Sequence, residues 1–203
     1  GRDRSWEYCY KCFYDARNDP SPDYDYLSLQ LAFYLASWGM YRGSSFLLQK
    51  DYKVHIPVVE ELLKSSYDCL LGISCKDLRK KEIQNTLSNL ETSITGYYSE
   101  IRKSVKGNEA KNPLSPLLLT KVLMGTLGCV PAYDRCFVYG IKDQKVSTGN
   151  YNLKSLLKLV DFYEKNKKRL EDTRSQFKVG ELEYPQMKLL DMGFWQIGLE
   201  KLP

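Results

Sequence analysis

The stretch YDYLSLQLAFYLASW, residues 24–38, decides the fold class of this chain. Asp23 precedes it and is a favoured N-cap residue, and Gly39 follows it and is a favoured helix stop. Apolar side chains fall on almost every face of the helix that it would form, rather than on one stripe. Such a helix is typical of the centre of a bundle, so we expect it to be surrounded by other helices.

Two further stretches share this character, PLLLTKVLMGTL at 116–127 and PQMKLLDMGFWQIGL at 185–199. In the first of them Ser115 supplies a cap and Pro116 stands at the first helical position, which is a strong start signal. Together with 24–38, these stretches predict three apolar central helices.

The remaining helical patterns are amphipathic, with apolar residues at three- and four-residue spacing. They cover 5–18, 56–71, 74–105, 132–139 and 152–176. Short polar stretches at 106–112 and 142–151 read as loops, whereas 50–55 alternates weakly and would suit an extended segment. The sequence therefore predicts an all-α fold, a compact bundle of about eight helices forming a single domain over 1–203.

Composition places the chain among folded proteins, with 203 residues, 43% hydrophobic and 27% charged. No apolar run reaches the roughly 18 residues of a membrane span, so no membrane association is expected. The N-terminal stretch GRDRSWEYCYKCF lacks the apolar core of a secretory signal. We therefore predict a cytoplasmic protein, and no oligomeric state follows from the sequence.

Cysteine usage fits that compartment. Cys9 and Cys12 form a lone CxxC, and His55 is the one histidine of the chain, so four zinc ligands are hard to assemble. We expect all six cysteines to be reduced thiols and no metal to be bound. Phosphate-loop and dinucleotide-binding motifs are absent from the sequence, so no cofactor is predicted.

Charged residues inside or beside the apolar stretches stand out, because an unpaired buried charge is costly. These are Arg42, Lys121, Asp134 and Asp191. One hypothesis is that they converge on a ligand pocket, which also has three aromatic walls: Trp38, Tyr133 and Trp195. The alternative is that they form structural ion pairs. In either case we expect Asp191 to be buried and paired with Arg42 or Lys121.

Basic residues concentrate in the second half of the amphipathic pattern at 152–176. The cluster consists of Lys165, Lys167, Lys168 and Arg169, in a chain of net charge +5 and pI near 8.7. A charge cluster of this kind is either a solvated helix face or a contact surface for nucleic-acid phosphates.

Three stretches, 24–49, 120–141 and 184–198, resemble an uncharacterised group of bacterial helical proteins. That resemblance implies an all-α fold and a bacterial source, with no assigned activity. Residues 120–134 are also similar to a segment of helix-hairpin-helix DNA glycosylases, which implies a catalytic role for Asp134. The chain has one residue more between Pro131 and Asp134 than that family usually has, and it lacks the family's glycine-containing hairpin.

Two functional hypotheses follow. The first is a non-enzymatic helical protein that acts through contacts with a protein or nucleic-acid partner. The second is an enzyme acting on nucleic acid, glycosylase-like, with Asp134 and Lys121 in its site. An enzyme should place Lys121, Asp134 and Arg42 within about 4–6 Å of one another in a concave site. A pure binder should show a continuous basic face and no polar pocket.

Overall fold

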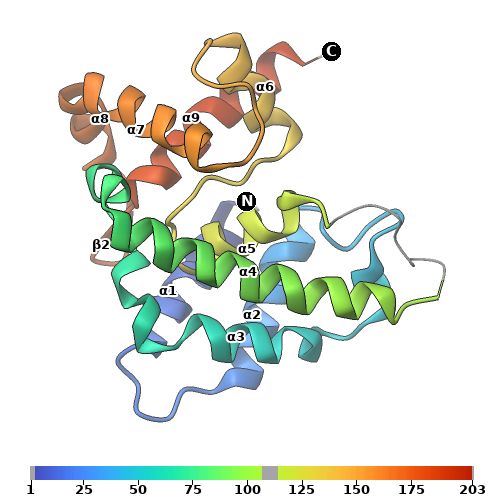
Figure 1. The fold of residues 1–203 in the computed structure, drawn as a ribbon. Coiled ribbons are helices and arrows are strands. Elements are labelled where there is room, and N and C mark those ends of the chain that lie inside the picture. The colour runs from blue at the N-terminus through green and yellow to red at the C-terminus, as the bar shows by residue number, and fades with distance from the viewer. Residues whose placement is uncertain (1–2, 107–113, 203) are drawn as a thin grey trace.

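The structure, a computed structural model, describes residues 3–106 and 114–202, and its regular secondary structure there is helical apart from one short hairpin (Figure 1). The α-helices of the described part are α1 (Asp3–Ala16), α2 (Tyr24–Ser37), α3 (Ile56–Leu62), α4 (Lys81–Lys103), α5 (Pro116–Thr126), α6 (Arg135–Asp143), α7 (Leu153–Lys165), α8 (Lys167–Arg174) and α9 (Gln186–Lys201). Four short 3₁₀ helices lie at Phe46–Gln49, Tyr52–His55, Ser65–Leu70 and Cys75–Arg79. The predicted all-α class is confirmed.

Helix starts follow local capping chemistry. Asp23, Ser115 and Asn152 each accept a hydrogen bond from a backbone N–H in the first turn of the helix that follows them. Such caps satisfy amide groups that have no partner inside the helix. They explain why these three boundaries were visible in the sequence.

Other boundaries differ from the predictions. The helix predicted over 56–71 ends at Leu62, and the one predicted over 74–105 begins only at Lys81, in both cases because a 3₁₀ segment replaces one or two turns. The pattern at 152–176 is split at Asn166, whose side-chain amide donates to the carbonyl of Phe162. An asparagine that bonds to nearby backbone competes with the helix, which accounts for the break.

Smaller differences concern the irregular segments. Residues 52–55 form a 3₁₀ turn where an extended segment had been expected. The predicted turn near Gly180 closes an antiparallel hairpin of β1 (Lys178–Val179) and β2 (Leu182–Glu183). Most of the loop predicted at 106–112 lies outside the described residues.

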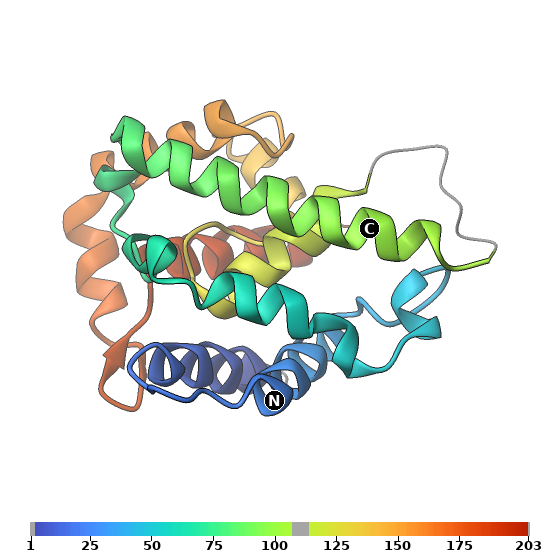
Figure 2. The ribbon, with the colours of Figure 1, turned by 60° about the horizontal axis from the view of Figure 1, so that its bottom comes forward.

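The helices form two groups, α1–α5 (the first helix group) and α6–α9 (the second helix group), joined by residues 127–134 (Figures 1 and 2). Within the second group α6 and α9 pack very closely. A Cβ atom at Gly140 would lie 2.0 Å from the carbonyl oxygen of Phe194, and one at Gly198 would lie 1.9 Å from that of Cys136. Only glycine permits this close approach of the two helices. The packing against α9 thereby fixes the position of α6, whose first turn is capped by Asp134.

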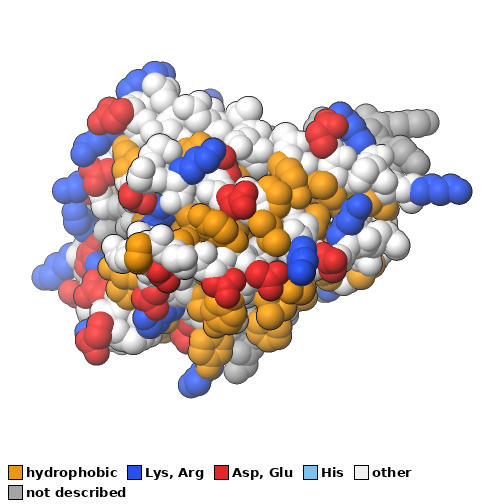
Figure 3. Space-filling model, turned by 90° about the horizontal axis from the view of Figure 1, so that it is seen from below, with side chains coloured by type: hydrophobic (Ala, Val, Ile, Leu, Met, Phe, Trp, Pro, Cys, Tyr) orange, Lys and Arg blue, Asp and Glu red, His pale blue; other side chains and the backbone are white. Residues whose placement is uncertain are grey.

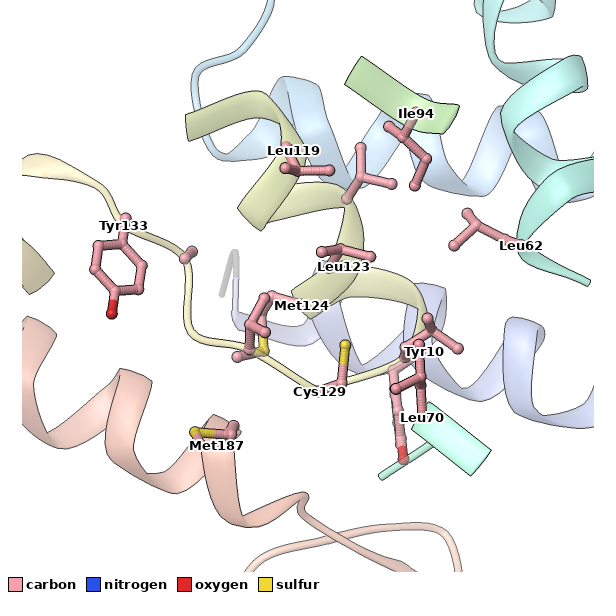
Figure 4. Packing of buried hydrophobic residues seen from close by; sticks show 14 of the residues in the cluster. Tyr10, Leu62, Leu70, Ile94, Leu119, Leu123, Met124, Cys129, Tyr133 and Met187 are labelled. Atoms are coloured by element: carbon pink, nitrogen blue, oxygen red, sulfur yellow. The ribbon is translucent and has the colours of Figure 1, made fainter. Parts of the chain in front are cut away.

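Helix α5 is at the centre of the core, and each of its residues from Leu118 to Thr126 is buried. Figure 4 shows Leu123 of α5 among side chains of neighbouring helices, including Leu62 of α3 and Ile94 of α4. The indole N–H of Trp6 donates to the carbonyl of Met124 at 2.9 Å, which ties α1 to α5. Among the predicted central helices, α5 is the one enclosed on all sides.

Helix α2 keeps one side exposed in spite of its apolar sequence. Leu29 and Phe33 expose 46% and 59% of their surface, and Tyr26 lies on the same side. Figure 3, which views the molecule from below, shows hydrophobic side chains gathered between acidic and basic ones. None of the helices in residues 3–106 and 114–202 combines the length and hydropathy that a membrane crossing requires.

Candidate functional site

Lys121 and Asp134 meet where the two helix groups join. Lys121 projects from the middle of α5 and is 3% exposed, and its Nζ lies 3.5 Å from Oδ2 of Asp134. The same ammonium group donates to the backbone carbonyl of Trp38 at 3.2 Å. Trp38 caps the C-terminus of α2, where the helix dipole favours a positive charge. The predicted encounter of Lys121 with Asp134 is therefore present in the structure.

Asp134 is held by the helix that it starts. Its Oδ1 accepts a hydrogen bond from the N–H of Phe137 at 3.0 Å, which caps α6 and leaves Oδ2 directed toward Lys121. Charge-assisted N–H···O bonds are usually about 2.7–2.9 Å long, so a separation of 3.5 Å marks a loose pair. Burial lowers the pKa of Lys121, while the charge of Asp134 opposes that effect. Both groups can thus turn toward a ligand.

Asp191 belongs to a second, tighter pair. It is 7% exposed, its Oδ2 lies 3.1 Å from Nζ of Lys188, and its Oδ1 accepts the N–H of Ala132 at 2.9 Å. Burial raises the pKa of Asp191, against the opposing effects of Lys188 and the Ala132 N–H. The prediction that Asp191 is buried and paired with a cation is confirmed. The predicted partners, Arg42 or Lys121, are wrong, because Lys188 stands three residues earlier on the same helix face.

Both lysines of these pairs contact the indole ring of Trp38. The ammonium groups of Lys121 and Lys188 are 5.3 Å and 5.8 Å from its centroid, both within range of a cation–π contact. Trp195 of α9 meets Trp38 edge to face, with ring centroids 5.9 Å apart and an interplanar angle of 84°. These two rings form a tryptophan partition, and the ring of Trp38 lies against both buried lysines.

Two cavities adjoin this partition, and both are lined by Trp38 and Trp195. The first cavity, of about 530 Å³, contains Lys121 and Asp134 and has two exposed arginines at its rim, Arg42 and Arg135. The second cavity, of about 500 Å³, contains Lys188 and Asp191 and is otherwise largely apolar. The first cavity collects three cations against one carboxylate and so favours an anionic ligand.

Gly39 shapes the rim of the first cavity. Its φ is +78°, a conformation that favours glycine, and a Cβ atom there would lie 2.9 Å from Nε of Arg42. The glycine that follows α2 thus allows the chain to turn back and place Arg42 in the lining of the first cavity.

The structure brings together most of the residues predicted for a site. Arg42, Lys121 and Asp134 line the first cavity, and Asp191 lines the second. Tyr133 does not follow the prediction, since it is absent from both linings: its hydroxyl bonds to Ser155 at 2.7 Å and its ring packs 5.0 Å from Phe137. Its burial on the connecting segment makes it a core residue, and Figure 4 shows it there.

Sequence reasoning missed two residues of the site, Arg135 and Lys188. Arg135 is the first residue of α6, directly after the capping Asp134, and adjacency to Asp134 was the available signal. Lys188 is only 7% exposed, because the ring of Trp6, 4.8 Å away, covers it along with Trp38.

The predicted basic cluster is exposed and surrounds the junction of α7 and α8. Leu170 and Thr173 of α8 line the second cavity. Arg169 precedes Thr173 by four residues and Lys167 precedes Leu170 by three, so both lie one helical turn from the cavity wall. Lys167 also lies 3.7 Å from Glu164. The cluster is thus adjacent to the second cavity along α8.

Within residues 3–106 and 114–202, no group of three or more histidine, cysteine or acidic side chains is arranged to hold a metal ion. The single histidine, His55, is buried, and its two ring nitrogens lie 2.7 Å and 2.6 Å from the hydroxyls of Tyr41 and Tyr98. Comparison with models of protein families, with characterised proteins and with solved structures finds no match to this chain.

Proposed function

We propose that this protein binds nucleic acid and acts on one nucleotide unit of it, held in the first cavity. One observation carries the proposal: the first cavity places Lys121, Arg42 and Arg135 around a single carboxylate, beside two tryptophan rings. Arginine guanidinium groups match phosphate oxygens in charge and geometry. Tryptophan rings offer stacking surfaces to bases of any sequence. Phosphate and base are the two parts of a nucleotide.

The basic cluster on α7 and α8 supports the same ligand class. Lys165, Lys168 and Arg169 are exposed and can contact the sugar–phosphate backbone on either side of the bound nucleotide. Contacts of this kind supply affinity without sequence preference. A nucleic acid would then be held by the cluster and positioned by the cavity.

Lys121 and Asp134 are the catalytic pair of this proposal, which names cleavage of the bond between base and sugar as the reaction. Asp134 can stabilise positive charge that develops on the sugar as that bond breaks. Lys121, whose pKa is lowered by burial, can donate a proton from Nζ to the departing base. A water molecule then adds to the anomeric carbon of the sugar in place of the base and returns a proton to Nζ, so the overall reaction is a hydrolysis. The resemblance of 120–134 to helix-hairpin-helix glycosylases agrees with this role for Asp134.

Binding is tested first, with a fluorescently labelled single-stranded oligonucleotide at low salt. Replacing Arg42 and Arg135 together by alanine should weaken binding about tenfold or more, because two phosphate contacts are lost. Both residues are exposed, so the fold should survive. A control variant with Arg4→Ala and Lys103→Ala removes the same charge from exposed positions outside the cavity lining.

Catalysis is tested separately, by base release from oligonucleotides carrying intact or damaged bases. Asp134→Asn removes the carboxylate charge and should therefore abolish base release. Asparagine is also a favoured N-cap residue, so α6 should keep its cap and binding should change little. Binding without base release from any substrate would leave the non-enzymatic hypothesis in place. An absence of oligonucleotide binding at low salt would contradict both the proposed binding of nucleic acid and the proposed reaction.

A further inference from the structure

The second cavity differs from the first in its chemistry. Leu170, Phe177, Met192 and Trp195 give it apolar and aromatic walls. Its charged groups already neutralise each other, since Asp191 engages Lys188 at 3.1 Å and the N–H of Ala132 at 2.9 Å. A cavity with apolar walls and an internally paired floor favours a neutral ring over an anion.

The two cavities are neighbours with a common wall. Trp38 and Trp195 line both, so a ligand in one cavity contacts the same partition as a ligand in the other. Arg169 lies one helical turn along α8 from Thr173 in the second cavity. Cations therefore flank the second cavity as well, with Arg42 and Arg135 on the side of the first cavity and Arg169 on α8.

We infer that the second cavity is a binding site for a neutral planar ring and that its occupant is a nucleobase. Resting on the proposed function, this base belongs to the nucleotide next to the one held in the first cavity. The ligand is then a pair of adjacent nucleotides, with the phosphate of one beside the arginines and the base of the other beyond the tryptophan partition. Stacking on an aromatic side chain contributes about tenfold or more in affinity per base in such sites.

Gly193 provides a way to close the second cavity alone. It lines that cavity, is exposed on α9, and has open space around the position of a Cβ atom. Gly193→Phe should therefore fill the cavity without a clash at the backbone. Gly96 is a matched control, because it is also an exposed helical glycine with open space at its Cβ position, and it lies on α4.

The experiment measures quenching of tryptophan fluorescence by three probes: adenosine, which is neutral, the mononucleotide dAMP, and the dinucleotide pdApdA. Adenosine should bind the wild type and Gly96→Phe alike, and about tenfold or more weaker to Gly193→Phe. Arg42→Ala with Arg135→Ala should leave the adenosine affinity within about twofold and weaken dAMP, since only dAMP carries a phosphate. The dinucleotide should bind about tenfold tighter than dAMP to the wild type, and no tighter than dAMP to Gly193→Phe.

The possible results separate the inference about the second cavity from the proposed function. Absence of adenosine binding to the wild type, or equal adenosine binding to the wild type and Gly193→Phe, overturns the inference. So does an equal loss of dAMP and dinucleotide affinity in Gly193→Phe, because one nucleotide would then span both cavities. If adenosine behaves as expected while the arginine variant changes no affinity, the proposed function fails and the ring site remains. Circular dichroism of each variant serves as the control for retention of the fold.

Discussion

The carboxylate of Asp191 accepts a hydrogen bond at 2.9 Å from the backbone N–H of Ala132 and so joins α9 to the segment that leads from α5 to α6. That segment is buried from Leu127 to Tyr133 without being helical, so its amide groups need partners from elsewhere. Asp191 supplies one of them. Because Asp134 follows two residues later, the last helix of the chain helps to position a residue of the first cavity.

Asp191→Ala should therefore destabilise the protein by roughly 3–5 kcal/mol, the scale for leaving one member of a buried ion pair alone. The substitution also removes the acceptor of the Ala132 N–H. Urea denaturation measures the change. Asp172→Ala, at an exposed position on α8, is the control and should stay within about half a kcal/mol of the wild type. A change that small for Asp191→Ala would contradict the assigned role.

The case of Asp191 shows what the sequence could predict. Its burial followed from the apolar circumference of the 185–199 helix. Its partner did not, although Lys188 stands only three residues away. Lys188 is buried by Trp6 and Trp38, which come from α1 and the end of α2. Contacts between elements so distant in the sequence decide which charged side chains are exposed.

The same limit applies to the cavities. Lys121 and Asp134 were identifiable because charged residues stood beside an apolar helix and a proline turn. The shape of the cavities could not be predicted, because it depends on how Trp38 meets Trp195 across the two helix groups. Fully apolar composition also overstated the burial of α2, where Phe33 is 59% exposed. Local composition predicts helices well and their surroundings only in part.

Charge reversal of Lys165, Lys167, Lys168 and Arg169 to glutamate should weaken oligonucleotide binding strongly and reduce its salt dependence, because fewer counterions are released. The four side chains are exposed, so the melting temperature should change little. The measurement is a series of binding curves at increasing salt. A control reverses four exposed lysines of the first helix group or just beyond it: Lys53, Lys64, Lys103 and Lys106. Equal losses in both variants would mean that only net charge matters.

His55 should make the protein less stable in mild acid. Burial lowers its pKa from 6.5 to about 3, so between these values the unfolded chain binds a proton that the folded protein does not. Stability contributed by His55 is therefore complete above about pH 6.5 and falls as the pH drops, by about 2 kcal/mol at pH 5. Urea denaturation at pH 7.5 and pH 5 measures the loss.

A His55→Gln variant separates this effect from the titration of carboxylates. Glutamine does not titrate, so the variant should lose less stability than the wild type between the two pH values. Equal losses in the two proteins would show that His55 is not responsible.

The thiols should fall into reactivity classes. All six cysteines are thiols outside any disulfide, with Cys69 exposed, Cys12 and Cys136 partly buried, and Cys9, Cys75 and Cys129 buried. Burial raises the pKa of each of the last three, which lowers the fraction of reactive thiolate. A thiol-specific reagent should label Cys69 first in the native protein and the buried three only on unfolding. Recovery of fewer than six thiols without reductant would contradict the reduced state.

Replacement of the two buried lysines by methionine, which keeps the length of the side chain, should lower the free energy of unfolding by very different amounts. Lys188→Met leaves Asp191 buried and should cost roughly 3–5 kcal/mol. Lys121→Met leaves Asp134, whose side chain is 16% exposed and caps α6 through Oδ1, so the cost should stay below about 1 kcal/mol. Base release, measured where the variant is folded, should be lost with Lys121→Met, because the proposed proton donor is absent. A large stability loss in Lys121→Met would identify Lys121 and Asp134 as a structural pair and remove the main support for the proposed site.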